Sequence, residues 1–209
     1  MNQFGSDHSA LGASPCTNRR AALRALGGAA VALLAMLGGG GGASARKRRQ
    51  PRSAFTCPAP AASEGEFLFG NDVRAAQIFT AGRSGTLRSI RVGINKPANT
   101  TGDYVVQLLQ VVNDVPSNLP PHVLAAVTVS DATVPEGEAT LTANFGGTRL
   151  VQGTEYAAAV SRLGNAAGDQ LIVETRKGTI CAGQFFFAAD GNAFNAQPAL
   201  DMVVSVFVA

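Results

Sequence analysis

Residues 138–145 read EATLTANF, and their alternation decides the fold class. In a β-strand, successive side chains point to opposite faces, so an apolar residue at every second position predicts a half-buried strand. Here one face would carry Ala139, Leu141, Ala143 and Phe145, with polar residues between them. Residues 201–209, DMVVSVFVA, repeat the pattern near the end of the sequence. The two stretches predict strands that each bury one face.

Seven further short stretches have a similar apolar character and bring the number of expected strands to nine. They are residues 76–81, 86–94, 104–112, 122–129, 155–163, 170–176 and 184–189. Segments rich in Gly, Pro, Asn and Asp separate them and are typical of turns. No stretch after residue 53 combines helical periodicity with caps. We therefore predict an all-β fold, a single antiparallel jelly-roll-like β-sandwich of about nine strands over residues 67–209.

A different kind of sequence precedes this body. Residues 25–37 form an apolar run, rich in Ala and Gly, between Arg19, Arg20 and Arg24 on one side and five glycines on the other. A membrane-spanning helix needs about 20 apolar residues, so this run is too short. It has the length of the hydrophobic region of an export signal. Ala43-Ser44-Ala45 matches a signal peptidase site, and we predict cleavage after Ala45.

The signal carries a further resemblance. Residues 18–26, NRRAALRAL, resemble a bacterial twin-arginine signal through the Arg19-Arg20 pair, Leu23 and Arg24. The resemblance implies export by the twin-arginine route, with the general secretory route as the alternative. The mature protein would be extracellular or held at the cell surface, with no transmembrane anchor after cleavage.

Charge is distributed unevenly along the sequence. The chain as a whole has a net charge of +3, but residues 46–52 alone hold five basic side chains, and the balance from Ser53 onward is −4. We interpret residues 46–66 as a basic, disordered linker, which could contact nucleic acid, anionic lipid or an acidic wall polymer or simply trail in solvent. The acidic body has no clustered positive charge for a phosphate backbone, and in an exported protein we expect no nucleic-acid partner.

Three cysteines occur, and Cys16 would leave with the signal. Cys57 and Cys181 then form a pair, and an oxidising compartment favours a disulfide between them. A metal site lacks companion ligands, and a catalytic thiol lacks a histidine nearby in the sequence.

Candidate catalytic residues are few. His122 is the one histidine after the predicted signal, and no phosphate-binding, dinucleotide-binding or HExxH motif occurs. The carboxylate pairs Glu64/Glu66 and Glu136/Glu138 lie in the linker and in a turn, where solvated charges are expected. We predict that the protein is not an enzyme.

The order of elements also resembles a known kind of module. AQIFTAGRSGTLRSIRVGINK (76–96), GDYVVQLLQV (102–111), a Gly-Thr-x-Tyr turn at Gly153, Thr154 and Tyr156, and the closing LDMVVSVFV (200–208) resemble jelly-roll-like modules of exported bacterial proteins. Such modules are described as choice-of-anchor or carbohydrate-binding-like domains. The resemblance implies a surface or extracellular role without catalysis, with a cell-envelope polymer or polysaccharide as partner.

Sugar binding uses exposed aromatic rings, and this sequence offers few. Phe185, Phe186 and Phe187 are consecutive, so at least one must face away from the core. Phe186, with Phe194 in the neighbouring loop, is the candidate binding pair of an alternative, carbohydrate-binding function. We expect no cofactor; Asp190 with Asn192, and Asn71 with Asp72, could serve a structural calcium, although Asp-Gly-Asn is typical of a turn.

Overall fold

The computed structural model of the chain describes residues 50–59, 73–98, 100–163, 170–178, 181–189 and 193–209, and the backbone alone of residues 64–68. The chain divides between Ala45 and Arg46 into two units. The first unit, with the predicted signal residues Arg19, Arg20 and Ala45, lies outside the described residues.

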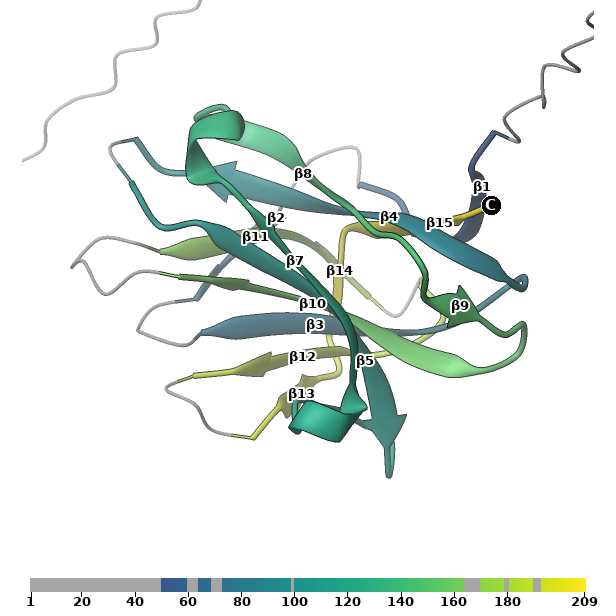
Figure 1. Cartoon of the computed structure of the whole chain (residues 1–209). Helices are drawn as coiled ribbons and strands as arrows, with labels where there is room; N and C mark the ends of the chain where they lie inside the picture. Colours follow the sequence, from purple (N-terminus) through teal and green to yellow (C-terminus); the bar gives the residue numbers. More distant parts are fainter. Residues whose placement is uncertain are drawn as a thin grey trace, which may run out of the picture. The chain divides into compact units, whose positions relative to one another are not determined.

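The second unit is a sandwich of two antiparallel sheets, as the sequence predicted (Figure 1). The described residues form eight strands in the first sheet: β1 (Arg52–Cys57), β2 (Glu64–Leu68), β4 (Gly85–Lys96), β8 (Gly137–Asn144), β9 (Arg149–Leu150), β11 (Leu171–Lys177), β14 (Leu200–Met202) and β15 (Val204–Val208). Seven form the second: β3 (Arg74–Thr80), β5 (Tyr104–Val112), β6 (Val115–Ser117), β7 (Val123–Val129), β10 (Glu155–Arg162), β12 (Phe185–Ala188) and β13 (Asn195–Gln197). Two short 3-10 helices, η1 (Pro120–His122) and η2 (Asp131–Thr133), flank β7.

Fifteen strands lie within the described ranges, six more than the expected nine; the additional strands are β1, β2, β6, β9, β13 and β14. Strands β6, β9, β13 and β14 have two or three residues, too few to show a period in the sequence. The predicted strand 201–209 is also split, because β14 pairs with β11 whereas β15 pairs with β4. Val203 lies at the step between them and bonds to both Glu174 and Gly93.

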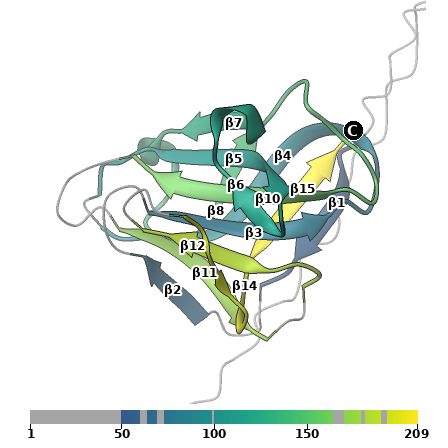
Figure 2. The same ribbon diagram turned by 90° about the horizontal axis from the view of Figure 1, so that it is seen from below.

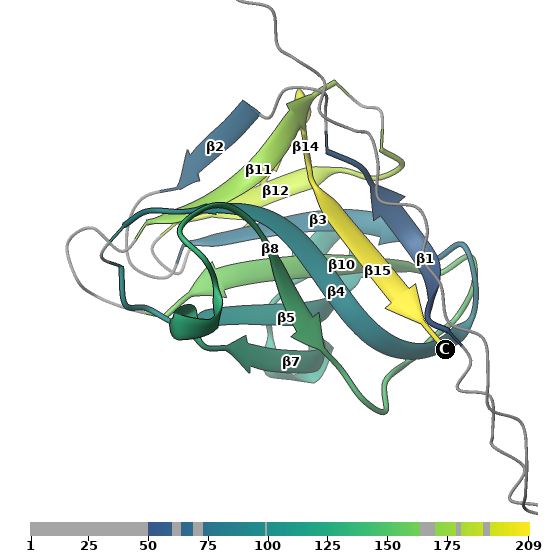
Figure 3. The same ribbon diagram turned by 90° about the horizontal axis from the view of Figure 1, so that it is seen from above.

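The start of the sandwich also differs from the prediction. Residues 46–66 were expected to be a linker, but β1 pairs along β15 and β2 pairs along β11. Figure 3 shows β1 and β15 side by side near the end of the chain. Strand β1 was not apparent from the sequence because its partner lies about 150 residues away and its six residues alternate only weakly.

The core lies between the sheets and follows the predicted alternation. In β8 the inward residues are Ala139, Leu141 and Ala143, and in β15 they are Val204, Val206 and Val208. One polar side chain crosses this core: the Oε1 atom of the fully buried Gln77 accepts a hydrogen bond of 2.9 Å from the backbone N–H of Met202. This bond joins β3 of the second sheet to β14 of the first. Figure 2 shows the two layers from below.

Candidate functional site

Phe186 and Phe194 do not form an exposed sugar-binding surface. Phe186 does point away from the main core, as alternation predicted, but it is only 3% exposed and Phe194 only 8%. Both belong to a second apolar cluster, with Ala76, Ala157, Ala159, Ala188, Ile78 and Leu109. The alanines of β3 and β10 leave room for the Phe186 ring to pack against the sheet. The expectation of an accessible aromatic pair was therefore wrong.

The structure does not test the predicted calcium ligands or the carboxylate pair of the predicted linker. The candidate calcium ligands Asn71, Asp72, Asp190 and Asn192 lie outside the described residues. The side chains of Glu64 and Glu66 are likewise not described.

The predicted disulfide between Cys57 and Cys181 is confirmed. It joins the end of β1 to the loop before β12 across 124 positions of sequence. Both cysteines are buried, and the backbone N–H of Cys181 donates to the carboxylate of Asp201. The sulfur atoms of Cys57 and Cys181 and a carboxylate oxygen of Asp201 lie close enough together to hold a metal ion. The two sulfurs are bonded to each other, however, so neither is available as a thiolate ligand.

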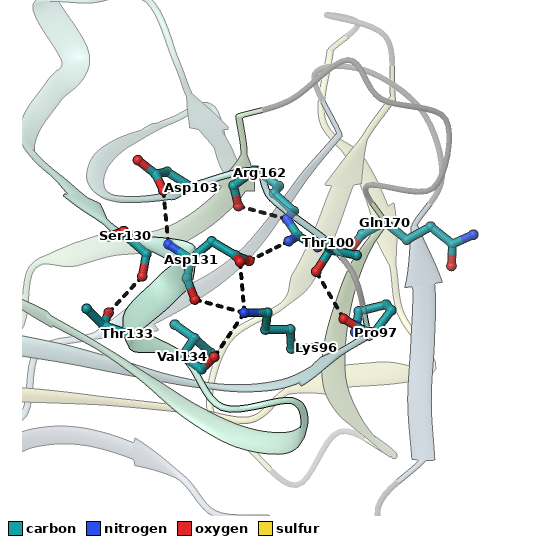
Figure 4. A network of polar contacts seen from close by, with 11 residues as sticks. Lys96, Pro97, Thr100, Asp103, Ser130, Asp131, Thr133, Val134, Arg162 and Gln170 are labelled. Carbon is teal, nitrogen blue, oxygen red and sulfur yellow. Dashed lines mark hydrogen bonds and ion pairs between the residues drawn. The ribbon is translucent and has the colours of Figure 1, made fainter.

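A buried ionic cluster, formed by Lys96, Asp131 and Arg162, lies at one end of the sandwich (Figure 4). The Asp131 carboxylate accepts from Lys96 Nζ at 2.8 Å through one oxygen and from an Arg162 terminal nitrogen at 2.6 Å through the other. Lys96 also donates to the backbone oxygens of Asp131 and Val134. All three donors of the lysine are thereby used.

Arg162 extends this cluster to the neighbouring loops. Its guanidinium donates to the backbone oxygens of Gly102 and Gln170, and it lies 4.9 Å from the centroid of the Tyr104 ring. Asp103 in turn accepts from the backbone N–H of Asp131. Because the charged groups bond to one another and to loop carbonyls, the cluster fastens the loops after β4, β7 and β10. We interpret it as a structural clasp.

His122 lies in η1 and contacts Ser117 in β6, with 2.6 Å between Nδ1 and the serine Oγ. A serine and a histidine in contact can form a catalytic pair when an acid orients the other ring nitrogen. Within the described part of the chain, no carboxylate bonds to the His122 ring. Ser117 and His122 are five positions apart in the sequence, and their contact holds the loop between them against the sheet.

Glu174 and Glu138 bring two carboxylates together on the outer face of the first sheet. Glu174 in β11 lies across Gly93 of β4, where a Cβ atom would collide with its carboxylate. Burial raises the pKa of Glu174 above its ordinary value of 4.5, and the Glu138 carboxylate raises it further. Glycine at position 93 is what makes this close approach sterically possible.

Five exposed arginines belong to the same sheet and to the turn before β4, and one of them, Arg91, is two residues from Gly93. Arg88 and Arg91 belong to β4, Arg149 to β9, Arg52 begins β1, and Arg83 lies in the turn between β3 and β4. Arg52 and Arg83 line a surface hollow of about 660 Å³ with Ala209. Among the described residues, none of the five forms an ion pair with a carboxylate. The expectation that the body carries no clustered positive charge was therefore wrong. The balance of −4 from Ser53 onward did not reveal this cluster, because the five arginines are separated by up to 97 positions in the sequence.

The arginine cluster includes one ordered aromatic contact. The Arg91 guanidinium carbon lies 4.7 Å from the centroid of the Phe207 ring. Both side chains project from the outer face, since Val92 and Val208 beside them point into the core. No sequence pattern indicated this pair, because β4 and β15 are brought together only by the fold.

Comparisons with known proteins leave the family open. No family model and no curated protein matches the sequence. The cysteine protease and lectin-like domains of Cwp84, a surface layer associated protein of Clostridium difficile, give a TM-score of 0.45 at 16% identity over 65% of this chain and 31% of that chain. The clostridial cysteine protease Cwp84 after propeptide cleavage gives a TM-score of 0.48 at 16% identity, over 69% and 37%. This chain thus matches about a third of those proteins, at a distance too great to assign an activity or a ligand.

Within the described ranges, neither short 3-10 helix has the length or hydropathy of a membrane span.

Proposed function

We propose that the chain is an exported, non-catalytic β-sandwich protein that acts outside the cell or at its surface as a structural or interaction module. The observation that carries this proposal is the buried disulfide between Cys57 and Cys181. Disulfides form and persist in oxidising compartments and are rare in the cytosol. The bond therefore agrees with the export signal expected in residues 1–45.

The proposal that the protein is not an enzyme is supported by how the polar groups are used. Lys96, Asp131 and Arg162 are buried and bond to one another and to loop carbonyls, so they are not free to act on a substrate. The Ser117 and His122 contact is local to one loop. The same proposal includes a relation to choice-of-anchor or carbohydrate-binding-like modules, which is supported by the order of sequence motifs between residues 76 and 208.

Cell fractionation of a bacterium that expresses the chain tests the proposal. We expect processed protein, beginning at Arg46, in the medium or on the cell surface. Replacement of Arg19 and Arg20 by lysine should retain the precursor in the cytoplasm, because the twin-arginine pathway requires the pair. Export of both forms would reject the twin-arginine route, and cytoplasmic retention of the unaltered chain would reject the function.

A further inference from the structure

We propose that the outer face of the eight-stranded sheet binds an acidic polysaccharide, a polymer of uronic acid type, with Arg91, which lies over the Phe207 ring, as its central anchor. This inference rests on the proposed function, since it names the partner of an exported interaction module. It also moves the sugar-binding surface from the buried Phe186 and Phe194 to the opposite sheet.

The guanidinium of Arg91 is available to bind an anion. Its central carbon lies over the Phe207 ring, 4.7 Å from the ring centroid, which is a cation–π contact. Two parallel N–H groups of a guanidinium can donate to both oxygens of one carboxylate. Among the described residues, Arg91 has no hydrogen-bond or ion-pair partner. The contact with Phe207 also restricts the side chain before binding, which lowers the entropic cost of ordering it.

The other arginines extend the positive surface away from this anchor. Arg88 adjoins Ser89, which pairs with Phe207, and Arg149 pairs with Thr86 in the next part of β4. Thr86 in turn exchanges two backbone hydrogen bonds with Ala209. The cluster therefore runs from the sheet face to the hollow lined by Arg52 and Arg83. A linear polymer with repeated carboxylates could meet several of these charges at once.

The side chains between the arginines suit a sugar chain. Hydroxyl and amide groups project from the same outer face of β1, β8 and β15, at Ser53, Thr56, Thr142, Asn144 and Ser205. Thr56, Ser205, Arg91 and Thr142 are paired in sequence across four adjacent strands. Such groups donate to and accept from sugar hydroxyls. The face thus combines neutral hydrogen-bonding groups with cations. The carboxylates of Glu138 and Glu174 lie on the same face, next to Gly93 and two positions along β4 from Arg91, so the acidic polymer would have to bind on the side of Arg91 away from them.

Two other anionic partners fit these observations less well. A lipid surface is bound most firmly where apolar side chains can insert, but the exposed large apolar residues Val112, Val115, Leu119 and Leu163 lie outside this sheet; Val151, beside β9, is the exception. Nucleic acid would require the protein to work in the compartment that the disulfide argues against. The binding experiment therefore includes lipid vesicles and nucleic acid as alternative ligands.

Binding to alginate, a linear polyuronate, tests the inference, with neutral dextran as the matched probe. The full chain with its disulfide formed should bind alginate and not dextran, and the affinity should fall as salt rises. Arg91→Gln should weaken binding by about tenfold to a hundredfold, as expected for the loss of charge-assisted hydrogen bonds. Phe207→Leu keeps an apolar side chain but removes the ring, and it should weaken binding several-fold.

Arg74→Gln is the matched control, because Arg74 lies in β3 of the other sheet and should leave binding unchanged. Thermal melting of each variant excludes unfolding as the cause of any loss. All these variants retain the basic residues 46–49, so differences between them report on the sheet. With residues 46–49 all replaced by glutamine, the Arg91→Gln substitution should still weaken binding by the same factor.

Several results would overturn the inference. These are alginate binding by Arg91→Gln within twofold of the unaltered chain, equal binding of dextran, or complete loss of binding on replacement of residues 46–49 alone. Tighter, Arg91-dependent binding of a DNA duplex, or of vesicles with 30% phosphatidylglycerol, would assign the face to those partners instead. Fractionation separates the two proposals: exported, disulfide-bonded protein that ignores alginate rejects this inference alone, whereas cytoplasmic protein with free thiols rejects the proposed function.

Discussion

Asp131 is the residue on which the structural clasp depends. Its two carboxylate oxygens face Lys96 and Arg162, and all three residues are buried. Removal of one member of a buried ionic group leaves the others charged in a medium that solvates them poorly.

Asp131→Asn should therefore lower the free energy of unfolding by about 3–5 kcal/mol, since two cations lose their counter-charge. Urea denaturation of the purified protein measures this change. Asp114→Asn is the control: Asp114 lies in an exposed turn with φ of 62°, a conformation that asparagine also adopts, so the change should be within about 0.5 kcal/mol. Equal effects of the two substitutions would show that the clasp does not stabilise the fold.

Glu174 gives the fold a dependence on pH whose sign follows from its environment. Burial, and then Glu138, raise its pKa above 4.5 in the folded state. The folded state thus favours the protonated carboxyl, so this contribution to stability is fully present below pH 4.5 and is lost as the pH rises through the raised pKa.

Glu174→Gln should accordingly raise the melting temperature at pH 7, because glutamine stays neutral. The difference from the unaltered chain should shrink towards zero as the pH falls below 4.5. Glu136→Gln, at an exposed position before β8, controls for the general loss of one negative charge. A lower melting temperature for Glu174→Gln at pH 7 would contradict the argument.

At the scale of the elements, the loop that leads into β12 comes unusually close to β3. Gly183 has φ of +123°, and a Cβ atom there would overlap the carbonyl oxygen of Ile78. The following residue, Gln184, accepts a hydrogen bond from the Ile78 N–H. Glycine at 183 lets β12 join the edge of β3.

Gly183→Ala should destabilise the protein by roughly 2–4 kcal/mol, from backbone strain and from displacement of β3 or β12. Gly146→Ala, where an added Cβ meets nothing within 4 Å, is the matched substitution and should be close to neutral. Chemical denaturation of the two variants in parallel provides the measurement. A Gly183→Ala protein as stable as Gly146→Ala would mean that this loop can move without cost.

The elements also show what could be predicted from sequence. Strands with a buried and a polar face, such as β8 and β15, were predictable because alternation is a local property. Strand β1 was not, because its register with β15 is set by the fold. The two clusters of polar residues could not be predicted for the same reason. The ionic cluster consists of Lys96, Asp131 and Arg162, which are distant in sequence and share no motif. The same holds for Arg91 and Phe207.

The sequence also could not predict which aromatic side chains are exposed to solvent. Alternation correctly placed Phe186 away from the main core, but it could not show that the alanines of neighbouring strands and Phe194 form a second cluster with it. The disulfide was predictable because just two cysteines follow the expected cleavage site.

For the whole molecule, the disulfide closes a loop over most of the folded unit. In the chain-entropy account, a closure of this length stabilises the native state by about 4–5 kcal/mol, through its effect on the unfolded chain. Replacement of both Cys57 and Cys181 by alanine should lower the unfolding free energy by about this amount in guanidinium titrations. A change below about 1 kcal/mol would show that the remaining contacts of β1 suffice.

The compartment of the folded protein is the central claim, and peptide mapping without reduction tests it most directly. Protein recovered from the extracellular fraction should begin at Arg46 and yield a cross-linked peptide pair that contains Cys57 and Cys181. A full-length chain that begins at Met1, is confined to the cytoplasm and has both thiols free to react with an alkylating reagent would contradict the account.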